Sequence, residues 1–517
     1  MKAIDLYSGV GGWNLGLRLC GIDVIKSFEW WPQAVNTSNI NLGTSHKPID
    51  IRSLNFKDLP KDIDIVVGSP PCTQFSYSNR GGSGDIDDGI IDLYKFFECI
   101  SVLRPKYWAM ENVPRVKKVL IEESRVGGQL HEFSKIINDG FIEVLDMSEF
   151  GTPQKRKRCI ASNVNLLLLN SYKIKCAPKT LGEVIENLAK KKVFDINYKN
   201  ELLREEVHDL EVEEDLNSLE ERMNREMKTN HPVYNNMAFP ENLNHPARTI
   251  TATCTRVSRE SLIIKSKKGY RRLSVRERAT IQGFPINFNF YGSSHSQKLK
   301  MIGNAIPPTF TYALGNAILE KNLKDFKATE TKVFKSATKE PPPKTTPDKT
   351  GKQYSKNRNF RFSPSFLRFK SGLRFELSNK NKNYSFKFFY GDSKNIEEIK
   401  IDKQMYKFLK RELKKFIDLE TFFTKENLNK VKFNSLDLQK VWTNEKKGTH
   451  PFMILDETEK MSKSIYKIIK EIDDLEINKI LEKIFRSSKF FNKKIEKNAD
   501  LILSGFITTS LINSISK

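Results

Sequence analysis

The sequence predicts an α/β fold for the N-terminal part of the chain and a separate α+β domain at its C-terminal end. Over the first 320 residues, short apolar runs that end in glycine or polar turns alternate with helical stretches. A segment rich in proline, threonine and lysine follows. The length of 517 residues also exceeds that of one compact domain, which indicates two to four domains.

The chain opens with a short apolar run, a glycine turn and a leucine-rich helical stretch. Residues 3–6 are predicted to form a buried strand that contains Asp5. Gly9, Gly11 and Gly12 then allow the backbone to pass close to a ligand, whose acidic end would face the helix N-terminus. A lone glycine turn of this kind is weak evidence for a ligand site, so the assignment depends on the residues at the ends of the following strands.

The second predicted strand, residues 24–28, ends in an acidic and an aromatic residue. Glu29 stands where nucleoside-binding α/β folds hold the ribose hydroxyls, and Trp30 could stack on an adenine ring. Asp50 follows at the expected end of a third strand, where its carboxylate would accept from the adenine amino group. Together these positions predict a nucleoside site.

A cysteine follows the next apolar run, residues 63–67, within the stretch GSPPCTQFS. Two prolines cannot continue a strand, so they should project Cys72 from a stiff loop at the strand end. A buried, inert cysteine is the alternative, and for this residue alone the two interpretations are equally good. The polar, glycine-rich residues 78–89 after it are predicted to form a mobile lid.

Two further stretches place polar side chains near this cysteine. After a helix over residues 90–103, the apolar run at 107–110 ends in Glu111, so a carboxylate and a thiol would meet at one sheet edge. In FGTPQKRKR, the alternate residues Gln154, Arg156 and Arg158 can share one face of an extended segment. In isolation, Glu111 could be a surface acid and the arginines plain phosphate contacts.

The order of these blocks resembles that of the cytosine-C5 DNA methyltransferases. The blocks are DLYSGVGG, EW, GSPPCTQFS, ENV, FGTPQKRKR, RRLSVRERATIQGFP and MIGNAIPP, and they cover residues 1 to about 320. Single blocks are weak matches, but seven in order are specific. The sequence departs from the family pattern at Thr73, where glutamine is common, and at Tyr7-Ser8, where phenylalanine-alanine is common.

The resemblance implies a covalent mechanism. Cys72 would attack C6 of a flipped cytosine, and nearby cations and a helix N-terminus would lower the pKa of its thiol. Glu111 would hydrogen-bond N3 and the exocyclic amine, Arg158 would hold O2, and Arg156 would support the site. The fold implied is a Rossmann-like, S-adenosylmethionine-dependent methyltransferase sheet with a smaller target-recognition domain.

The resemblance also implies a set of residues for the cofactor and a set for DNA. S-adenosylmethionine would be bound by Asp5, Tyr7, Gly9, Gly11, Glu29, Trp30, Asp50, Pro71, Leu93 and Asn304. Double-stranded DNA would be contacted by Arg248, Thr249, Thr251, Thr253, Arg256 and Arg259. The threonines also alternate as a strand would, so a purely structural role stays open for them. Gly303 and Asn304 are expected to form a turn that returns the chain to the cofactor.

The family pattern and the composition together predict domain boundaries. The catalytic and cofactor-binding domain spans 1–159 and resumes at 271–320 after a recognition region at 160–270. Residues 321–352 form a linker with little to bury, and 353–517 a basic accessory domain whose phenylalanines suggest short strands and hairpins.

Charge is concentrated at the C-terminal end. Of the net charge of +24, residues 321–517 contribute +19, with 44 Lys and Arg against 25 Asp and Glu. This excess favours binding to nucleic acid, although a solvated surface from a lysine-rich genome is nearly as good an explanation. No catalytic constellation stands out there, which disfavours a fused restriction nuclease.

The predicted function is sequence-specific methylation of cytosine at C5, in the modification enzyme of a restriction-modification system. The alternatives are a tRNA cytosine-5 methyltransferase, a bifunctional enzyme fused to a nuclease, and a non-enzymatic DNA-binding regulator. A regulator requires that at least one of the seven sequence blocks is disrupted, and none is. Six unpaired cysteines, no CxxC spacing, no apolar membrane span and no secretory signal predict a cytoplasmic, nucleoid-associated protein without a metal. A monomer is expected, with a cognate restriction endonuclease as the possible partner.

Overall fold

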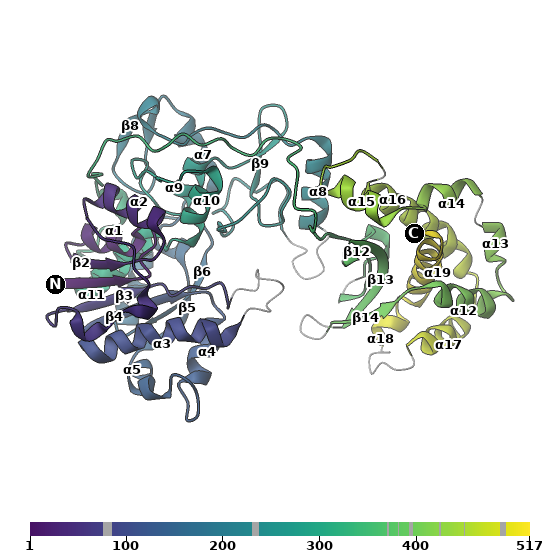
Figure 1. The fold of residues 1–517 in the computed structure, drawn as a ribbon, viewed down its shortest axis with the longest axis horizontal. Helices are drawn as coiled ribbons and strands as arrows, with labels where there is room; N and C mark the ends of the chain where they lie inside the picture. Colours follow the sequence, from purple (N-terminus) through teal and green to yellow (C-terminus); the bar gives the residue numbers. More distant parts are fainter. Residues whose placement is uncertain are drawn as a thin grey trace. The chain divides into compact units, whose positions relative to one another are not determined.

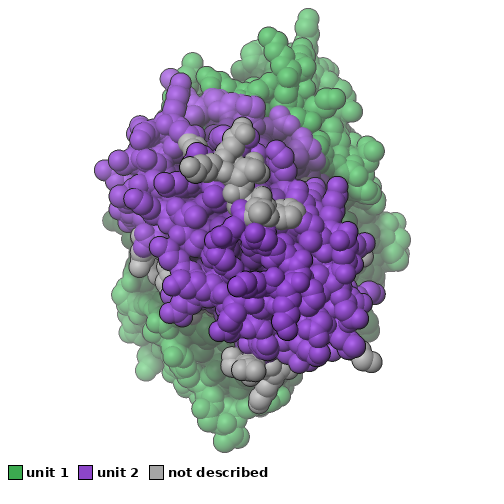
Figure 2. Space-filling view, turned by 90° about the vertical axis from the view of Figure 1, so that its right-hand side faces the viewer, with its two compact units in different colours: residues 1–216, 240–348 green, residues 217–239, 349–517 purple. Residues whose placement is uncertain are grey.

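The computed structural model describes residues 1–75, 85–229, 237–369, 372–380, 382–391, 396–422, 425–448, 450–485 and 493–517. The chain forms two compact units, shown in Figures 1 and 2. Unit 1 comprises residues 1–216 and 240–348, and unit 2 comprises residues 217–239 and 349–517. The lid expected at 78–89 falls largely outside the described residues.

Unit 1 is organised around a six-stranded sheet with the order β2-β1-β3-β4-β6-β5. The strands are β1 (Lys2–Leu6), β2 (Asp23–Phe28), β3 (Ile65–Gly68), β4 (Tyr107–Asn112), β5 (Phe141–Asp146) and β6 (Lys157–Ser162). The first four are parallel, and β6 runs antiparallel between β4 and β5. The predicted mainly parallel sheet of an α/β fold is therefore confirmed.

Helices cover both faces of this sheet (Figure 1), because successive strand residues point to opposite sides. In β3, Val66 faces a core that includes α3 (Ile86–Leu103). Ile65 and Val67 face the core formed with α1 (Gly12–Leu19) and α11 (Pro308–Ile318). Gly16 permits the close approach of α1 to α11, since a Cβ there would overlap Thr311 Oγ1. The helix that follows the last family block thus packs on the first helix.

The recognition region and the segment that follows it form a second part of unit 1 with its own hydrophobic core. Short hairpins and helices supply this core, which includes the buried side chains of Leu181, Ile264 and Phe288. The remaining elements of unit 1 are α2 (Pro32–Leu42), α4 (Val116–Glu123), α5 (Ser134–Asn138), α6 (Leu166–Ser171), α7 (Leu181–Ala189), β7 (Lys192–Phe194), β8 (Glu201–Leu203), β9 (Ile263–Lys265), β10 (Tyr270–Arg272), α9 (Val275–Ile281) and α10 (His295–Asn304).

Several local predictions differ from the structure. No third strand ends at Asp50; its side chain instead caps a short 3-10 helix, Ile51–Ser53, by accepting from the Arg52 N–H. Gly303 and Asn304 do not form a turn, because both lie in the last turn of α10. The predicted linker also has more to bury than its composition suggests: the side chains of Phe326 and Phe334 are 2% and 6% exposed.

Unit 2 combines an antiparallel sheet with a group of helices, which confirms the predicted α+β class. The sheet has the order β11-β12-β13-β14, and α19 is buried through most of its length. The elements are α8 (Ser218–Thr229), β11 (Arg361–Phe362), β12 (Arg374–Lys380), β13 (Asn383–Gly391), β14 (Ile396–Lys400), α12 (Lys403–Leu413), α13 (Leu419–Phe422), α14 (Lys425–Val431), α15 (Ser435–Trp442), α16 (Pro451–Ile469), α17 (Asp474–Ile484), α18 (Lys493–Glu496) and α19 (Ala499–Ile515).

Helix α8 belongs to unit 2 although its sequence lies inside the predicted recognition region, 160–270. It contacts residues that follow it by more than two hundred positions, such as Asp456, and no local pattern signals such a contact. No described helix is long and apolar enough to cross a membrane. Among the described residues, no group of three or more His, Cys, Asp or Glu is placed to hold a metal ion.

Candidate active site

The parallel strands β1 to β4 bring four chain segments to one edge of the sheet. Chain order reverses between β1 and β3, since β2 lies on one side of β1 and β3 on the other. Ligands of open α/β sheets bind beyond the strand ends at such a reversal. The glycine turn after β1, the Glu29 segment after β2, the Cys72 loop after β3 and the end of β4 all lie at this edge.

The loop that carries Cys72 is fixed by hydrogen bonds to neighbouring elements. Ser69 Oγ accepts from Trp13 Nε1 at 3.0 Å, and the Pro70 carbonyl accepts from Asn112 Nδ2 at 3.0 Å. The Phe75 N–H donates to the Cys72 carbonyl at 3.1 Å, and the Phe75 side chain is fully buried. The two prolines and these bonds hold the half-buried Cys72 thiol in one place.

Glu111 and Arg158 form an ion pair beside this thiol. Arg158 Nε lies 2.9 Å from Glu111 Oε1, and their side chains are only 13% and 7% exposed. Adjacent antiparallel strands supply them, because Glu111 of β4 pairs in register with Ile160 of β6. A carboxylate and a guanidinium thus lie together at the sheet edge, as the sequence predicts.

The pKa of Cys72 departs from the expectation. Burial raises the pKa of this thiol, the positive charge of Arg158 lowers it, and the negative charge of Glu111 raises it, with a raised pKa as the net result. The predicted lowering was wrong because burial disfavours the thiolate and Glu111 partly cancels the guanidinium.

Arg156 and Gln154 face the interior, as the alternation of the segment predicts, while the residues next to Arg156 are exposed or partly exposed. Arg156 donates to the carbonyl oxygens of Ile250 at 3.0 Å, Gly303 at 3.0 Å and Ala305 at 3.3 Å. Burial lowers its pKa to about 9, with a further contribution from the Arg158 charge. Arg156 is therefore a positioning residue that ties distant segments together.

Gln154 extends this network to a residue that the sequence did not reveal. Its Nε2 donates to Gln282 Oε1 at 2.7 Å, and its Oε1 accepts from the Ile250 N–H at 2.7 Å. Gln282 in turn donates to the Ala305 carbonyl. A pairing across more than a hundred residues leaves no signal in one sequence.

At the other end of the edge, two buried carboxylates face the glycine turn. Glu29 accepts from the Gly9 N–H at 2.9 Å and from the Trp31 N–H at 2.8 Å. Both carboxylate oxygens of Asp5 are buried, and neither accepts a well-formed hydrogen bond among the described residues. Burial and the Glu29 charge raise the pKa of Asp5 well above its usual value. A hydrogen bond from the Asn14 backbone offsets this rise only in part, and an amino group of a ligand would supply a further donor.

The space around this turn suits a nucleoside ligand. The backbone at Gly9 has a φ of +54°, and a Cβ there would meet nothing within 4 Å. The Trp30 side chain is 62% exposed, so its ring face is available for stacking. Glu29, Gly9 and Asp5 thus fit a ribose-bearing, amine-containing group such as S-adenosylmethionine.

Other predicted cofactor residues differ in their placement. Tyr7 is half-buried and donates to Asp92 at 3.2 Å, and Asp92 pairs with Arg52 at 2.7 Å. Asp92, on α3, is therefore a polar neighbour of Tyr7 that the sequence analysis missed.

The remaining five predicted positions range from the core to the surface. Leu93 is fully buried in the hydrophobic core on the sheet-facing side of α3, so its side chain offers no exposed surface to a ligand. Gly11 is buried and Pro71 is half-buried, whereas Asp50 and Asn304 are exposed. Trp30, Asp50 and Asn304 are therefore the predicted cofactor positions whose side chains are exposed.

The arginines predicted to contact DNA are engaged within the protein. Arg248 pairs with Glu241 at 2.5 Å and Arg259 with Glu260 at 3.0 Å. Arg256 is fully buried and pairs with Glu213 at 3.2 Å. Its assignment as a surface DNA contact does not fit the structure, because carboxylate and carbonyl partners enclose its guanidinium.

The three threonines lie in irregular structure, with no strand assigned to them. Thr249 Oγ1 donates to the Lys155 carbonyl at 2.9 Å, and Thr251 Oγ1 donates to the Thr253 carbonyl at 3.1 Å. Thr253 is exposed. Of the six predicted DNA contacts, Thr253 is the one whose exposure suits base readout best.

Arg256 belongs to a buried ion cluster that also holds Glu213, Arg272 and Asp348. Arg272 Nε donates to Glu213 Oε2 at 2.7 Å and its Nη2 lies 3.1 Å from Asp348 Oδ2. Burial opposes ionisation of Glu213, but His295, Arg272 and Arg256 together lower its pKa to about 2. The cluster joins residues that lie just before the chain leaves unit 1 at 216 and at 348.

A mainly parallel sheet that carries a half-buried thiol, a carboxylate–guanidinium pair and a glycine turn at one edge is the framework of an α/β enzyme. Residues 1–320 match the model of the C-5 cytosine-specific DNA methylase family. The chain belongs to this family and is a DNA (cytosine-5-)-methyltransferase.

Curated relatives agree over the same part of the chain. Type II methyltransferase M.HindV of Haemophilus influenzae is 28% identical over 337 residues, which cover 62% of this chain and 96% of that protein. Type II methyltransferase M.FnuDI of Fusobacterium nucleatum is 27% identical, with 62% of this chain and 94% of that protein covered. For M.NgoPII of Neisseria gonorrhoeae the values are 27%, 62% and 95%. The matched part corresponds closely to the family region.

Proposed function

We propose that this enzyme transfers a methyl group from S-adenosylmethionine to C5 of a flipped cytosine within a specific duplex sequence, as the modification enzyme of a restriction-modification system. The observation that carries the proposal is the Glu111–Arg158 ion pair beside Cys72, at the same sheet edge as the Asp5 and Glu29 carboxylates. The Type II methyltransferases among its relatives support the biological setting. We expect a cytoplasmic monomer that acts beside a cognate endonuclease.

The chain's own residues account for each step at the base. The Cys72 thiolate adds to C6 of cytosine, and the electron pair of the C5–C6 double bond moves towards C5, which makes C5 nucleophilic. Glu111 hydrogen-bonds N3 and the exocyclic amine, and Arg158 holds O2, so both bear on the charge that develops in the ring. After methylation, C5 loses its proton and the S–C6 bond breaks, which returns the thiolate.

The buried Asp5 and Glu29 carboxyl groups and the exposed Trp30 ring support cofactor binding near the glycine turn. S-adenosylmethionine supplies the methyl group when bound. Glu29 would hold its ribose hydroxyls, Asp5 would accept from its amino group, and Trp30 would stack on the adenine ring. Gly9 leaves room for the ligand because no side chain occupies that position.

A serine substitution at Cys72 tests the mechanism. Cys72→Ser should abolish tritium transfer from labelled S-adenosylmethionine to duplex DNA, while DNA binding persists, because a serine hydroxyl is a far weaker nucleophile than a thiolate. Cys176→Ser is the matched control, since Cys176 is also half-buried and follows a short 3-10 helix, Tyr172–Lys175, outside the parallel strands.

Three outcomes would contradict the proposal. Full activity of Cys72→Ser would exclude the covalent mechanism, and tritium transfer to tRNA instead of duplex DNA would exclude the substrate. Sequencing the methylated cytosines in DNA from an expressing strain then identifies the target sequence, and the absence of any common sequence around them would exclude the proposed specificity.

A further inference from the structure

Helix α8 lies in the segment 217–239, which folds with unit 2. The unit 1 residues before and after this segment are hydrogen-bonded to one hairpin, formed by β9 and β10. The Leu216 N–H donates to the Tyr270 carbonyl of β10 at 2.7 Å, and the Glu241 N–H donates to the Ile263 carbonyl of β9 at 2.8 Å. The intervening residues 217–239 fold with unit 2. The recognition region therefore contributes one helix to the C-terminal unit.

Arg222 joins α8 to the first half of α16. Its Nη2 lies 2.5 Å from Asp456 Oδ1, and its guanidinium stacks over the Phe452 ring at 4.5 Å. At the start of α8, Glu220 Oε1 accepts from the Gly351 N–H at 3.3 Å. One side chain thus combines an ion pair with a cation–π contact to the C-terminal segment.

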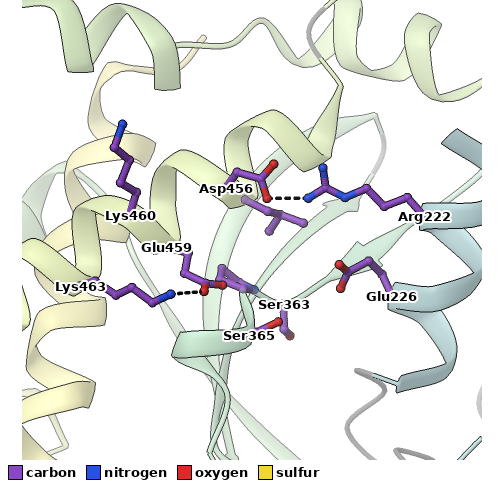
Figure 3. A pocket seen from close by; sticks show the side chains of 10 residues that line it. Arg222, Glu226, Ser363, Ser365, Asp456, Glu459, Lys460 and Lys463 are labelled. Atoms are coloured by element: carbon purple, nitrogen blue, oxygen red, sulfur yellow. Dashed lines mark hydrogen bonds and ion pairs between the residues drawn. The ribbon is translucent and has the colours of Figure 1, made fainter. Parts of the chain in front are cut away.

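A pocket of about 420 Å³ lies along this junction (Figure 3). Arg222 and Glu226 project towards it from α8, and Asp456, Glu459 and Lys463 line it from α16. Within α16, Lys463 Nζ lies 2.7 Å from Glu459 Oε1. The acidic side chains of α16 all lie in its first half, near α8.

From Lys460 to its C-terminal end, α16 carries an exposed basic face that starts at this pocket, while its opposite face is buried. Lys460, Lys463, Lys467 and Lys470 recur at spacings of three and four, so they share one helix face, and no acidic residue lies between the first and the last. Neither Lys460 nor Lys467 has an ion-pair partner among the described residues. We call these four residues the α16 lysine stripe.

We propose that the α16 lysine stripe binds the phosphate backbone of the duplex DNA that the enzyme methylates. The proposal rests on the proposed function, in which residues 160–270 read the target, because α8 comes from that region. The Arg222 junction then links target reading to backbone binding through α16. Duplex DNA is the partner that fits, since the substrate of the enzyme itself presents a regular array of phosphates.

Length and charge agree with this partner. At a rise of about 1.5 Å per residue, the stripe spans about 15 Å, which matches about four phosphates of one strand at about 3.4 Å each along the axis. Residues 349–517 carry 37 Lys and Arg against 21 Asp and Glu, a net charge of +16. Two thirds of the net charge of the chain, +16 of +24, therefore lies in the part that holds the stripe.

Helix α12 and the residue after it provide a matched control. Lys403, Lys407, Lys410 and Lys414 also lie on one helix face and are exposed, and Lys410 pairs with Glu420 as Lys463 of the stripe pairs with Glu459. Among the described residues, no hydrogen bond or ion pair joins α12 to α8. Changing these four lysines to Gln removes the same charge from the same unit.

The test compares two quadruple Lys→Gln variants of the full chain, one in the α16 stripe and one in α12. Binding to a duplex that contains the mapped target is measured from about 0.05 to 0.2 M salt. The α16 variant should lower the log–log salt slope by about 3, because each phosphate contact contributes about 0.9. Its affinity should fall at least tenfold at low salt, with the affinity for S-adenosylmethionine unchanged. The α12 variant should keep the wild-type slope.

An equal decrease of the salt slope in both variants would overturn the proposal, because it would indicate a general charge effect. An unchanged salt slope in both variants would also overturn it, because it would show that the stripe does not contact DNA phosphates. Loss of methylation by Cys72→Ser is independent of both variants, so failure of the proposed function would be recognised separately.

A charge exchange tests the junction. Arg222→Asp and Asp456→Arg should each raise the KM for target DNA about tenfold, and the double variant should recover most of that loss, with cofactor affinity constant throughout. Wild-type KM values in both single variants would show that α8 and the stripe act independently. A double variant whose KM for target DNA stays as high as in the single variants would also show that α8 and the stripe act independently.

Discussion

Unit 1 contains a cluster of buried arginines, whereas unit 2 carries an exposed stripe of lysines. In unit 1, Arg256, Arg272 and Arg276 are at most 1% exposed and donate to carboxylates and carbonyl oxygens. In unit 2, the α16 lysine stripe is exposed. The difference follows from the side chains, because a planar guanidinium with five donors can be satisfied inside a protein, whereas an ammonium group is more strongly hydrated.

This contrast explains why the basic segment 248–259 does not present the exposed arginines that its sequence suggests for a DNA surface. Its arginines pair with carboxylates within unit 1. The exposed lysine stripe instead lies in a part of the chain outside the family region. Charge in a sequence therefore predicts a polyanion partner only where the structure leaves that charge exposed.

The largest expected effect is on the buried cluster. Arg272→Ala leaves Glu213 buried without its closest partner, so the free energy of unfolding of unit 1 should fall by about 3–5 kcal/mol. Denaturant unfolding, followed by a probe in unit 1, measures this loss. A loss below about 1 kcal/mol would show that the cluster does not hold unit 1 together and would break the comparison.

Acid should weaken the same cluster. The pKa of Glu213 is about 2 in the folded chain against its usual value of 4.5. A carboxyl group whose pKa is lowered in the folded state stabilises the fold above pH 4.5, and this stabilisation is lost as the pH falls through 2. For Glu213 the free energy lost is about 3 kcal/mol. The pH dependence of unfolding between about pH 5 and 2 should therefore be smaller in Glu213→Gln than in the wild type. Equal slopes would contradict the role of this carboxylate.

A buried charge that serves a ligand should show a different effect. Glu29→Ala should weaken S-adenosylmethionine binding by about 1–3 kcal/mol, since charge-assisted hydrogen bonds to the ribose are lost. Titration calorimetry measures the affinity, with Glu122→Ala on α4 as an exposed control. Unchanged affinity in Glu29→Ala would refute its assignment.

The smallest effect is expected for an exposed pair of unit 2. Lys446 Nζ lies 3.0 Å from Asp437 Oδ1, and both side chains are about half exposed. Lys446→Ala should change the free energy of unfolding by less than about 0.5 kcal/mol, because water screens the pair. A decrease in the free energy of unfolding as large as that of Arg272→Ala would contradict the distinction between buried ion pairs in unit 1 and exposed charges in unit 2.

The sequence by itself determined the order of the strands in the chain, the glycine turn and the chemistry at the sheet edge. Cys72 and Glu111 could be predicted because parallel strands bring their carboxyl ends to one edge, and Arg158 joins them because the antiparallel strand β6 begins at that edge. Local apolar patterns and turn residues carry that information, as do the alternating buried residues Gln154 and Arg156.

Only the tertiary structure decided the environment of those residues and the membership of α8. The raised pKa of Cys72 depends on burial and on the charges that surround it, and burial is a property of the packed chain. Arg256 is enclosed by a carboxylate more than forty positions away, and α8 folds with a segment more than a hundred positions away. Such contacts depend on how distant segments pack, which no local pattern of one sequence encodes.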